Sequence, residues 1–128
     1  MQVHLSRPDI TDREITIINE VIRSPILALG PKLVEFERAI ASYVGRKHAV
    51  AVNSGTSGLH LLVRAFGIGE GDEVITTPFS FIASSNCILY EKAKPVFVDI
   101  EPDTANIDPN LIEDAITPRA KAILPVDA

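Results

Sequence analysis

The sequence predicts an α/β fold with a mostly parallel sheet and helices on its faces. From His48 onward, short apolar runs alternate with segments of helical periodicity. The connections between them carry turn residues such as Gly67, Gly71 and Pro109. Strands that are separated by helices pair in parallel, because the chain must cross from one end of the sheet to the other between them.

The chain is predicted to begin with a helix that starts after Thr11. Thr11 and Glu14 have the spacing of a capping box, and an apolar stripe follows at helical intervals. Ser24-Pro25 ends this helix, because the residue before a proline disfavours helical backbone angles.

A second helix is predicted to follow Leu29-Gly30-Pro31 and to end at Gly45, a residue type that commonly closes helices. Its apolar side chains fall toward one side: Leu33, Val34, Phe36, Ile40 and Tyr43. Residues 1–46 are therefore expected to form an N-terminal helical segment that precedes any strand.

Residues 47–128 are expected to form the alternating part of the sheet. The predicted strands cover residues 49–52, 73–76, 96–98 and 122–126, and the predicted helices cover about 56–66, 81–92 and 109–116. Gly67, Gly69 and Gly71 are turn residues and not a dinucleotide-binding fingerprint, because they follow a helix and lead into a strand.

Composition favours an intracellular protein with one core. The chain is 46% hydrophobic and contains a single cysteine, Cys87, which excludes an internal disulfide framework. Its net charge of -5 and scattered basic residues argue against nucleic acid as a partner. The N-terminus lacks a signal-peptide layout, and no apolar run approaches the roughly 20 residues that span a membrane. A cytoplasmic location without membrane contact is expected.

The most informative segment is the small-residue turn Asn53–Gly58, which lies between a strand-like run and a helix-like run. Such a turn directs unpaired backbone N–H groups and hydroxyls at one point, where the helix dipole adds positive potential. It is a candidate phosphate site. Taken by itself, the pattern fits an ordinary helix-entry turn equally well.

Other polar and aromatic residues are expected beside this turn. Ligands of an open parallel sheet bind outside the carboxyl ends of its strands. Phe79–Phe81, Asp99 and Asp127 each follow a predicted strand, as Asn53–Ser57 does. Together they indicate a phosphorylated ligand that carries a flat ring.

Four linked motifs resemble the DegT/DnrJ/EryC1/StrS family of pyridoxal 5'-phosphate (PLP)-dependent sugar aminotransferases. The motifs are residues 53–61, 67–75, 93–100 and 107–109, and Leu29-Gly30-Pro31 and Phe36-Glu37 also fit the family's N-terminal pattern. The resemblance implies the aspartate aminotransferase-like fold, PLP transferase fold type I. The chain is then expected to be the N-terminal part of the major domain, truncated before the rest of that domain and the C-terminal small domain.

The resemblance assigns roles to individual positions. Gly55, Thr56 and Ser57 match the turn that holds the cofactor phosphate, and Phe81 matches the aromatic residue that stacks on the pyridine ring. Asn86, on the same predicted helix as Phe81, is expected to line the cofactor pocket. Gly30 falls in the loop near the nucleotide-sugar site, which a second subunit usually completes. A homodimer with shared active sites is therefore implied.

No catalytic residue is assigned within the chain. A PLP transaminase needs a Schiff-base lysine and an acid that pairs with the pyridine nitrogen, and the resemblance places both beyond Ala128. None of the lysines matches the catalytic position: Lys32, Lys47, Lys92, Lys94 and Lys121. The 128-residue chain alone is expected to be inactive and poorly soluble, because its sheet edges would be unpaired.

Several residues have a plainer structural interpretation. By composition alone Phe81 is more often a core residue. His60 is expected to pack on a helix beside the sheet, and Asp99 to act in a turn. The histidines lack the spaced partners of a metal site, so no metal is expected. Cys87 has no basic neighbour that would activate it and is expected in the core.

Three functions stay open. The first is transfer of an amino group, with L-glutamate as the expected donor, to a keto group of a nucleotide-linked deoxysugar, as the resemblance implies for the intact protein. The second is a sugar deoxygenase-dehydratase that uses PLP or pyridoxamine phosphate (PMP), in which a histidine replaces the Schiff-base lysine. The third is an inactive fragment. The sugar, the nucleotide, the aminated carbon and the pathway, which in this family serves polysaccharides or antibiotic sugars, are not determined by the sequence.

Overall fold

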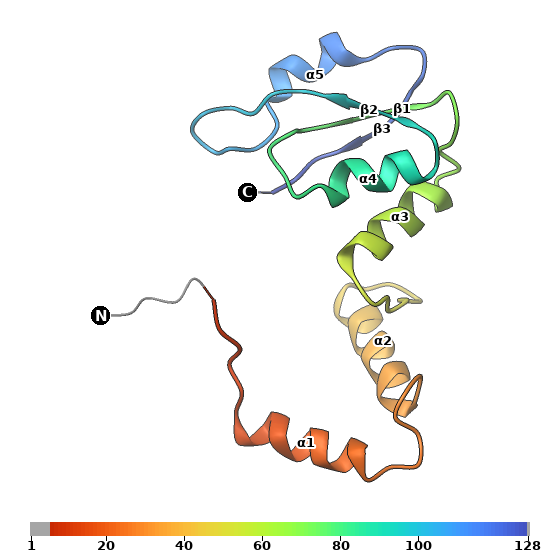
Figure 1. Ribbon diagram of the computed structural model, residues 1–128, viewed down its shortest axis with the longest axis vertical. Helices are drawn as coiled ribbons and strands as arrows, with labels where there is room; N and C mark the ends of the chain where they lie inside the picture. The colour runs from red at the N-terminus through yellow and green to blue at the C-terminus, as the bar shows by residue number, and fades with distance from the viewer. Residues whose placement is uncertain (1–5, 128) are drawn as a thin grey trace. The chain divides into compact units, whose positions relative to one another are not determined.

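The computed structural model describes residues 6–127, and it divides between Ala51 and Val52 into two compact units. The first unit contains α1 (Asp12–Ile22) and α2 (Pro31–Tyr43). The second contains α3 (Gly55–Ala65), β1 (Glu73–Thr76), α4 (Ala83–Tyr90), β2 (Lys94–Phe97), α5 (Pro109–Ala115) and β3 (Ala120–Leu124) (Figure 1).

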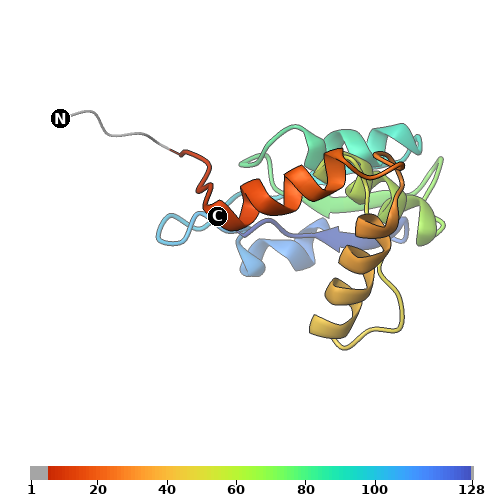
Figure 2. The ribbon, with the colours of Figure 1, turned by 90° about the horizontal axis from the view of Figure 1, so that it is seen from below.

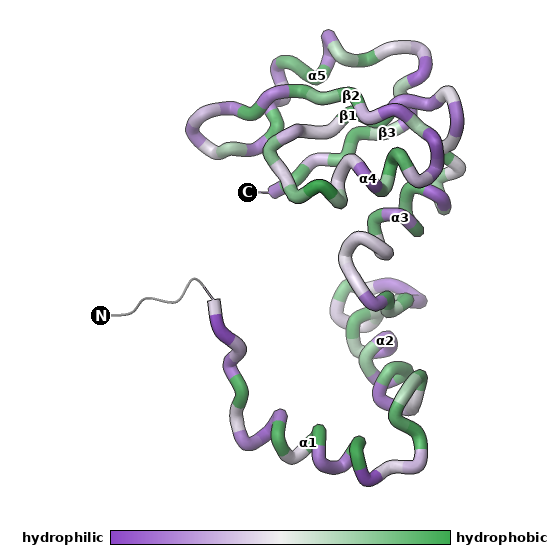
Figure 3. Tube along the Cα trace, viewed as in Figure 1, coloured by the Kyte–Doolittle hydropathy of each residue, from purple (hydrophilic) through white to green (hydrophobic). Residues whose placement is uncertain are grey.

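The helix boundaries of the first unit follow the predicted capping signals. Thr11 caps α1 with the complete capping box, in which the Glu14 carboxylate accepts from the Thr11 backbone N–H and hydroxyl. Gly45 follows α2 with a φ of 64°, a left-handed angle that costs glycine little. Apolar and polar residues alternate along α1, and its isoleucines are largely exposed (Figure 3).

The second unit has a three-stranded parallel sheet in the order β2-β1-β3. The central strand β1 is buried along its whole length. Two views show α4 over one face of this sheet and α5 over the other (Figures 1 and 2). The predicted α/β class and parallel sheet are therefore confirmed.

Alternate side chains of β1 enter two cores, because successive residues of a strand point to opposite faces. Val74 packs with Val63 of α3 and with Cys87 and Ile88 of α4. Ile75 packs on the other face with Val98 and Ile107. Cys87 is fully buried, as predicted, and burial raises the pKa of its thiol.

The prediction of a strand at residues 49–52 is wrong. Within the described residues, this segment belongs to neither a helix nor a strand. The backbone N–H of Ala51 donates to Oε1 of Glu37 at 2.9 Å instead of joining a ladder. A strand exists only with a hydrogen-bonded neighbour, and apolar character alone does not supply one.

The other boundaries shift by one or two residues. β3 begins at Ala120 instead of residue 122, because Ala120 pairs with Glu73 at the start of β1. β2 begins at Lys94 and includes Pro95, which a strand at the edge of a sheet tolerates.

Candidate cofactor site

The turn before α3 is held by its own side chains. Oγ of Ser54 caps the helix by accepting from the backbone N–H of Ser57 at 3.1 Å, and it lies 3.0 Å from Oγ of Ser57. The Ser57 hydroxyl donates to Oδ1 of Asn53 at 2.7 Å. The turn is thus fixed in one shape by short polar residues.

Gly55 and Thr56 leave two donors available at this helix start. Among residues 6–127, neither of their backbone N–H groups has a hydrogen-bond partner, and neither does the Thr56 hydroxyl. A Cβ added to Gly55 would meet no atom within 4 Å. Unpaired donors beside open space at the positive end of a helix suit an anion with several oxygens, such as a phosphate.

The loop after β1 presents the predicted aromatic residue. The buried Thr77 hydroxyl accepts from the backbone N–H of Phe79 at 3.2 Å, and Oγ of Ser80 lies 2.7 Å from Oγ of Ser84. Phe81 follows this braced loop and is 76% exposed. It is therefore not a core residue among the described residues, and its ring is available to a ligand.

α3 and α4 bring the turn and the loop toward the same edge of the sheet. Short connections lead from α3 into β1 and from β1 into α4, and the two helices pack against each other (Figure 1). His60 and Arg64, in the second half of α3, contact Glu91 just after α4. Because their C-terminal halves meet, both helices run in the same direction and start toward the carboxyl ends of the strands.

The two other predicted residues belong to other elements. Asn86 is a partly buried residue within α4. Gly30 belongs to the first unit, where it caps α2 after Leu29, which has a φ of 53°. A Cβ on Gly30 would lie 3.0 Å from the carbonyl oxygen of Ile26, so a larger residue there would have to displace this carbonyl slightly.

Asp99 and Asp127 each follow a strand, as the sequence predicts for residues at this edge of the sheet. The Asp99 carboxylate accepts from the backbone N–H of Ile100 at 2.8 Å, a local contact in an irregular segment. Asp127 is exposed. No group of three or more acidic, histidine or cysteine side chains suited to a metal ion is found within residues 6–127.

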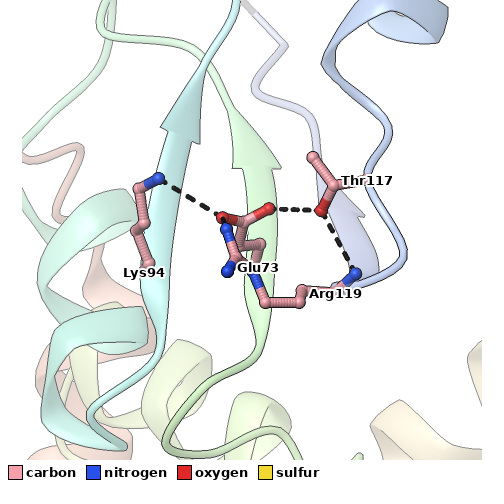
Figure 4. A network of polar contacts seen from close by, with 4 residues as sticks. All are labelled: Glu73, Lys94, Thr117 and Arg119. Atoms are coloured by element: carbon pink, nitrogen blue, oxygen red, sulfur yellow. Dashed lines mark hydrogen bonds and ion pairs between the residues drawn. The ribbon is translucent and has the colours of Figure 1, made fainter.

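The sequence analysis missed Glu73, which has the most side-chain partners of any carboxylate within residues 6–127. Glu73 is 2% exposed and accepts from Thr117 Oγ1 at 2.5 Å, from Arg119 at 2.8 Å and from Lys94 at 3.3 Å (Figure 4). Hydrogen bonds from Thr117 and Arg119 lower its pKa to about 2. It begins β1, at the edge opposite the candidate site, so we interpret this cluster as structural. The sequence signal that could have revealed Glu73 is a charged residue within a strand that is predicted to be buried.

Within the part of the chain that the structure describes, no helix is both long and apolar enough to cross a bilayer.

Known structures share this fold over nearly the whole chain. A protein of Streptococcus pneumoniae, described as a candidate sugar aminotransferase and solved in its PMP form, matches with a TM-score of 0.90 and 40% identity. The match covers 97% of this chain and 31% of that one. The fold is that of the PLP-dependent aminotransferases of fold type I, of which these residues form a part.

Sequence comparison identifies the family. The profile of the DegT/DnrJ/EryC1/StrS aminotransferase family matches residues 8–128, and the chain belongs to that family. The spore coat polysaccharide biosynthesis protein SpsC of Bacillus subtilis is 50% identical over 94% of this chain and 31% of its own length. The UDP-2-acetamido-2-deoxy-3-oxo-D-glucuronate aminotransferase of Pseudomonas aeruginosa is 46% identical over 85% of this chain and 30% of its own length. The chain thus spans about three tenths of these relatives.

Removing the helix cap tests the local structure of the turn. We expect Ser54→Ala to lower the free energy of unfolding by about 1 kcal/mol, because the Ser57 N–H loses its acceptor. Ser54→Gly should cost only a few tenths of that amount, since glycine leaves the helix start open to water. Urea denaturation of the full-length variants measures both, and equal losses would contradict a capping role.

Proposed function

We propose that this chain is the N-terminal part of the major domain of a PLP-dependent aminotransferase that acts on a nucleotide-linked keto-deoxysugar, with L-glutamate as amino donor. The observation that carries the proposal is the turn at Gly55–Ser57, with its two unpaired N–H groups and open space. Membership of the family and the PMP form of the pneumococcal structure support the same ligand.

The residues of the turn fit the cofactor's phosphate. The backbone N–H groups of Gly55 and Thr56 and the Thr56 hydroxyl would donate to its oxygens, while Ser54 and Asn53 hold the backbone in place. The Ser57 hydroxyl would have to exchange Asn53 for a phosphate oxygen in order to donate. When bound, PLP supplies an electron sink that lets an amino group move between an amino acid and a keto compound.

Phe81 and Asn86 would act on the ring side of the same ligand. A stacked aromatic ring orients a planar group and shields it from water. Gly30 is proposed to lie at the nucleotide-sugar site, which a second copy of the chain would complete in a homodimer. The relatives named for a UDP-sugar and for spore coat polysaccharide favour this substrate class.

Borohydride treatment of the full-length protein with PLP tests the function. If the protein is a transaminase, reduction should attach the cofactor covalently to a lysine peptide beyond Ala128, which mass spectrometry can locate. Reversible PLP binding that borohydride does not fix would favour the deoxygenase-dehydratase, in which a histidine stands at that position. Absence of PLP binding would refute both.

Phe81→Ala tests the proposed ring contact. We expect PLP affinity to fall about two- to tenfold, because stacking of a planar ring on an aromatic side chain contributes roughly 0.5–1.5 kcal/mol. Stability should hardly change, since the side chain is 76% exposed. Phe79→Ala is the matched control, because Phe79 lies in the same loop and is 57% exposed without an assigned role. Absorbance titration with PLP measures both, and equal losses would refute stacking on Phe81.

A further inference from the structure

His60 and Glu91 join the two helices that bear the proposed cofactor site. Nε2 of His60 lies 2.7 Å from Oε1 of Glu91, which directly follows α4. The imidazole also meets the ring of Tyr90, the last residue of α4, edge to face at a centroid distance of 5.2 Å. Both side chains of the pair are at least two-thirds buried. The proposed chemistry uses neither of them.

The place of His60 in α3 links this contact to the phosphate turn. His60 lies three residues after Ser57, and residues at that spacing share a helix face. Ser57 is tied to Ser54 and Asn53, so a rotation of α3 about its axis would carry the turn with it. The helices also share an apolar core that includes Val63 and Ile88. Because apolar contacts are non-directional, they do not by themselves prevent such a rotation.

At the other end of α4 lies the loop that carries Phe81. The backbone N–H of Ser84 donates to the carbonyl of Phe81 at 3.1 Å, so this loop is continuous with the first turn of α4. A contact that fixes α3 against α4 therefore fixes the distance between the phosphate turn and the aromatic ring. A cofactor held at both its phosphate and its ring is sensitive to that distance.

We propose that His60 and Glu91 are positioning residues, whose contact holds the phosphate turn of α3 in register with the Phe81 loop of α4. The inference rests on the proposed function. The charged groups that face the imidazole are Glu91, from the segment after α4, and Arg64 of α3, whose guanidinium lies 3.7 Å from the same carboxylate oxygen. Arg64 is 70% exposed and can stay with Glu91 when His60 is replaced.

The experiment compares PLP binding by the full-length wild-type protein with that of His60→Gln, Glu91→Gln and the double variant. Each single variant should weaken PLP binding about fivefold. The double variant should weaken it no further than the more affected single variant does, because the two residues act through one contact. Lys94→Gln is the matched control. It removes an ion pair of the same unit at the opposite edge of the sheet and should leave PLP affinity unchanged.

Comparison of affinity with stability separates positioning from general stability. If His60 acts by positioning, the loss of PLP affinity in His60→Gln should persist at temperatures well below the melting range of the variant. A purely structural loss would lower the melting temperature and leave the PLP affinity of the folded protein unchanged.

The outcomes are distinct. If wild-type protein binds no PLP, the proposed function fails. If wild-type protein binds PLP and both single variants bind it equally well, the positioning role is overturned while the function stands. If His60→Gln does not fold, Glu91→Gln alone decides, since it removes the carboxylate charge from the same contact and leaves the imidazole in place. Additive losses in the double variant would also overturn the proposal.

Discussion

Gly55→Asp in the full-length protein is expected to reduce PLP affinity at least about 100-fold, because a carboxylate would occupy the proposed phosphate position and repel the anion, at a cost of several kcal/mol. The unliganded fold should be unaffected. A Cβ at this position meets no atom within 4 Å, and an acidic side chain in the first turn of a helix is favourable. The pairing of lost binding with retained stability is the distinctive part of the prediction.

Fluorescence or absorbance titration with PLP measures the affinity, and thermal melting without cofactor measures the fold. Gly55→Ala is the control, because it adds a methyl group without a charge and should reduce affinity far less. Normal PLP binding by Gly55→Asp would show that the turn is an ordinary helix entry. A lower melting temperature of the unliganded variant would show that the open space beside Gly55 is filled in the intact protein.

Glu73→Gln is expected to cause the largest loss of stability of the polar substitutions considered. Glu73 is almost fully buried and receives three side-chain donors, and loss of its charge weakens the contacts with Arg119 and Lys94 together. We expect the melting temperature to fall by several degrees at neutral pH, and by more than in Ser54→Ala. PLP affinity should be retained well below the melting range.

The pH dependence follows from the lowered pKa of Glu73. Its value in the folded protein is about 2 against an ordinary 4.5, so its contribution to stability is fully present above about 4.5 and is lost as the pH falls toward 2. The difference in melting temperature between wild type and Glu73→Gln should shrink over that window, because a protonated glutamate resembles glutamine. A difference that stays constant from pH 6 to 2.5 would contradict the lowered pKa. Glu35→Gln is the control, since Glu35 forms only an exposed pair with Lys32.

Features that depend on neighbours in the sequence were predictable. The capping box at Thr11 and Glu14, the closing glycine at Gly45 and the small-residue turn at residues 53–58 each involve groups within a few residues of one another. Their geometry is therefore set by local backbone preferences and side-chain reach. The same reason explains why Gly55–Ser57 could be proposed as a phosphate site before the fold was known.

Features that depend on distant partners were not predictable. Nothing local to residues 49–52 indicates whether a neighbouring strand exists, so this apolar run predicts a strand that the described residues do not contain. The starts of β2 and β3 depend on how they pair with Glu73. The exposure of the Phe81 side chain was also not predictable, because phenylalanine is more often buried in a core.

The sequence alone determined the α/β class, the helix caps and the family, because these depend on periodicity, local hydrogen bonds and the order of the motifs. Only the tertiary structure decided that β1 is central, that Val74 and Ile75 enter different cores, and that Glu73 and His60 have their partners in Arg119 and Glu91. Those pairs are separated by 46 and 31 residues along the chain. Contacts at such separations form only when the whole sheet and its helices are packed, so no local pattern carries them.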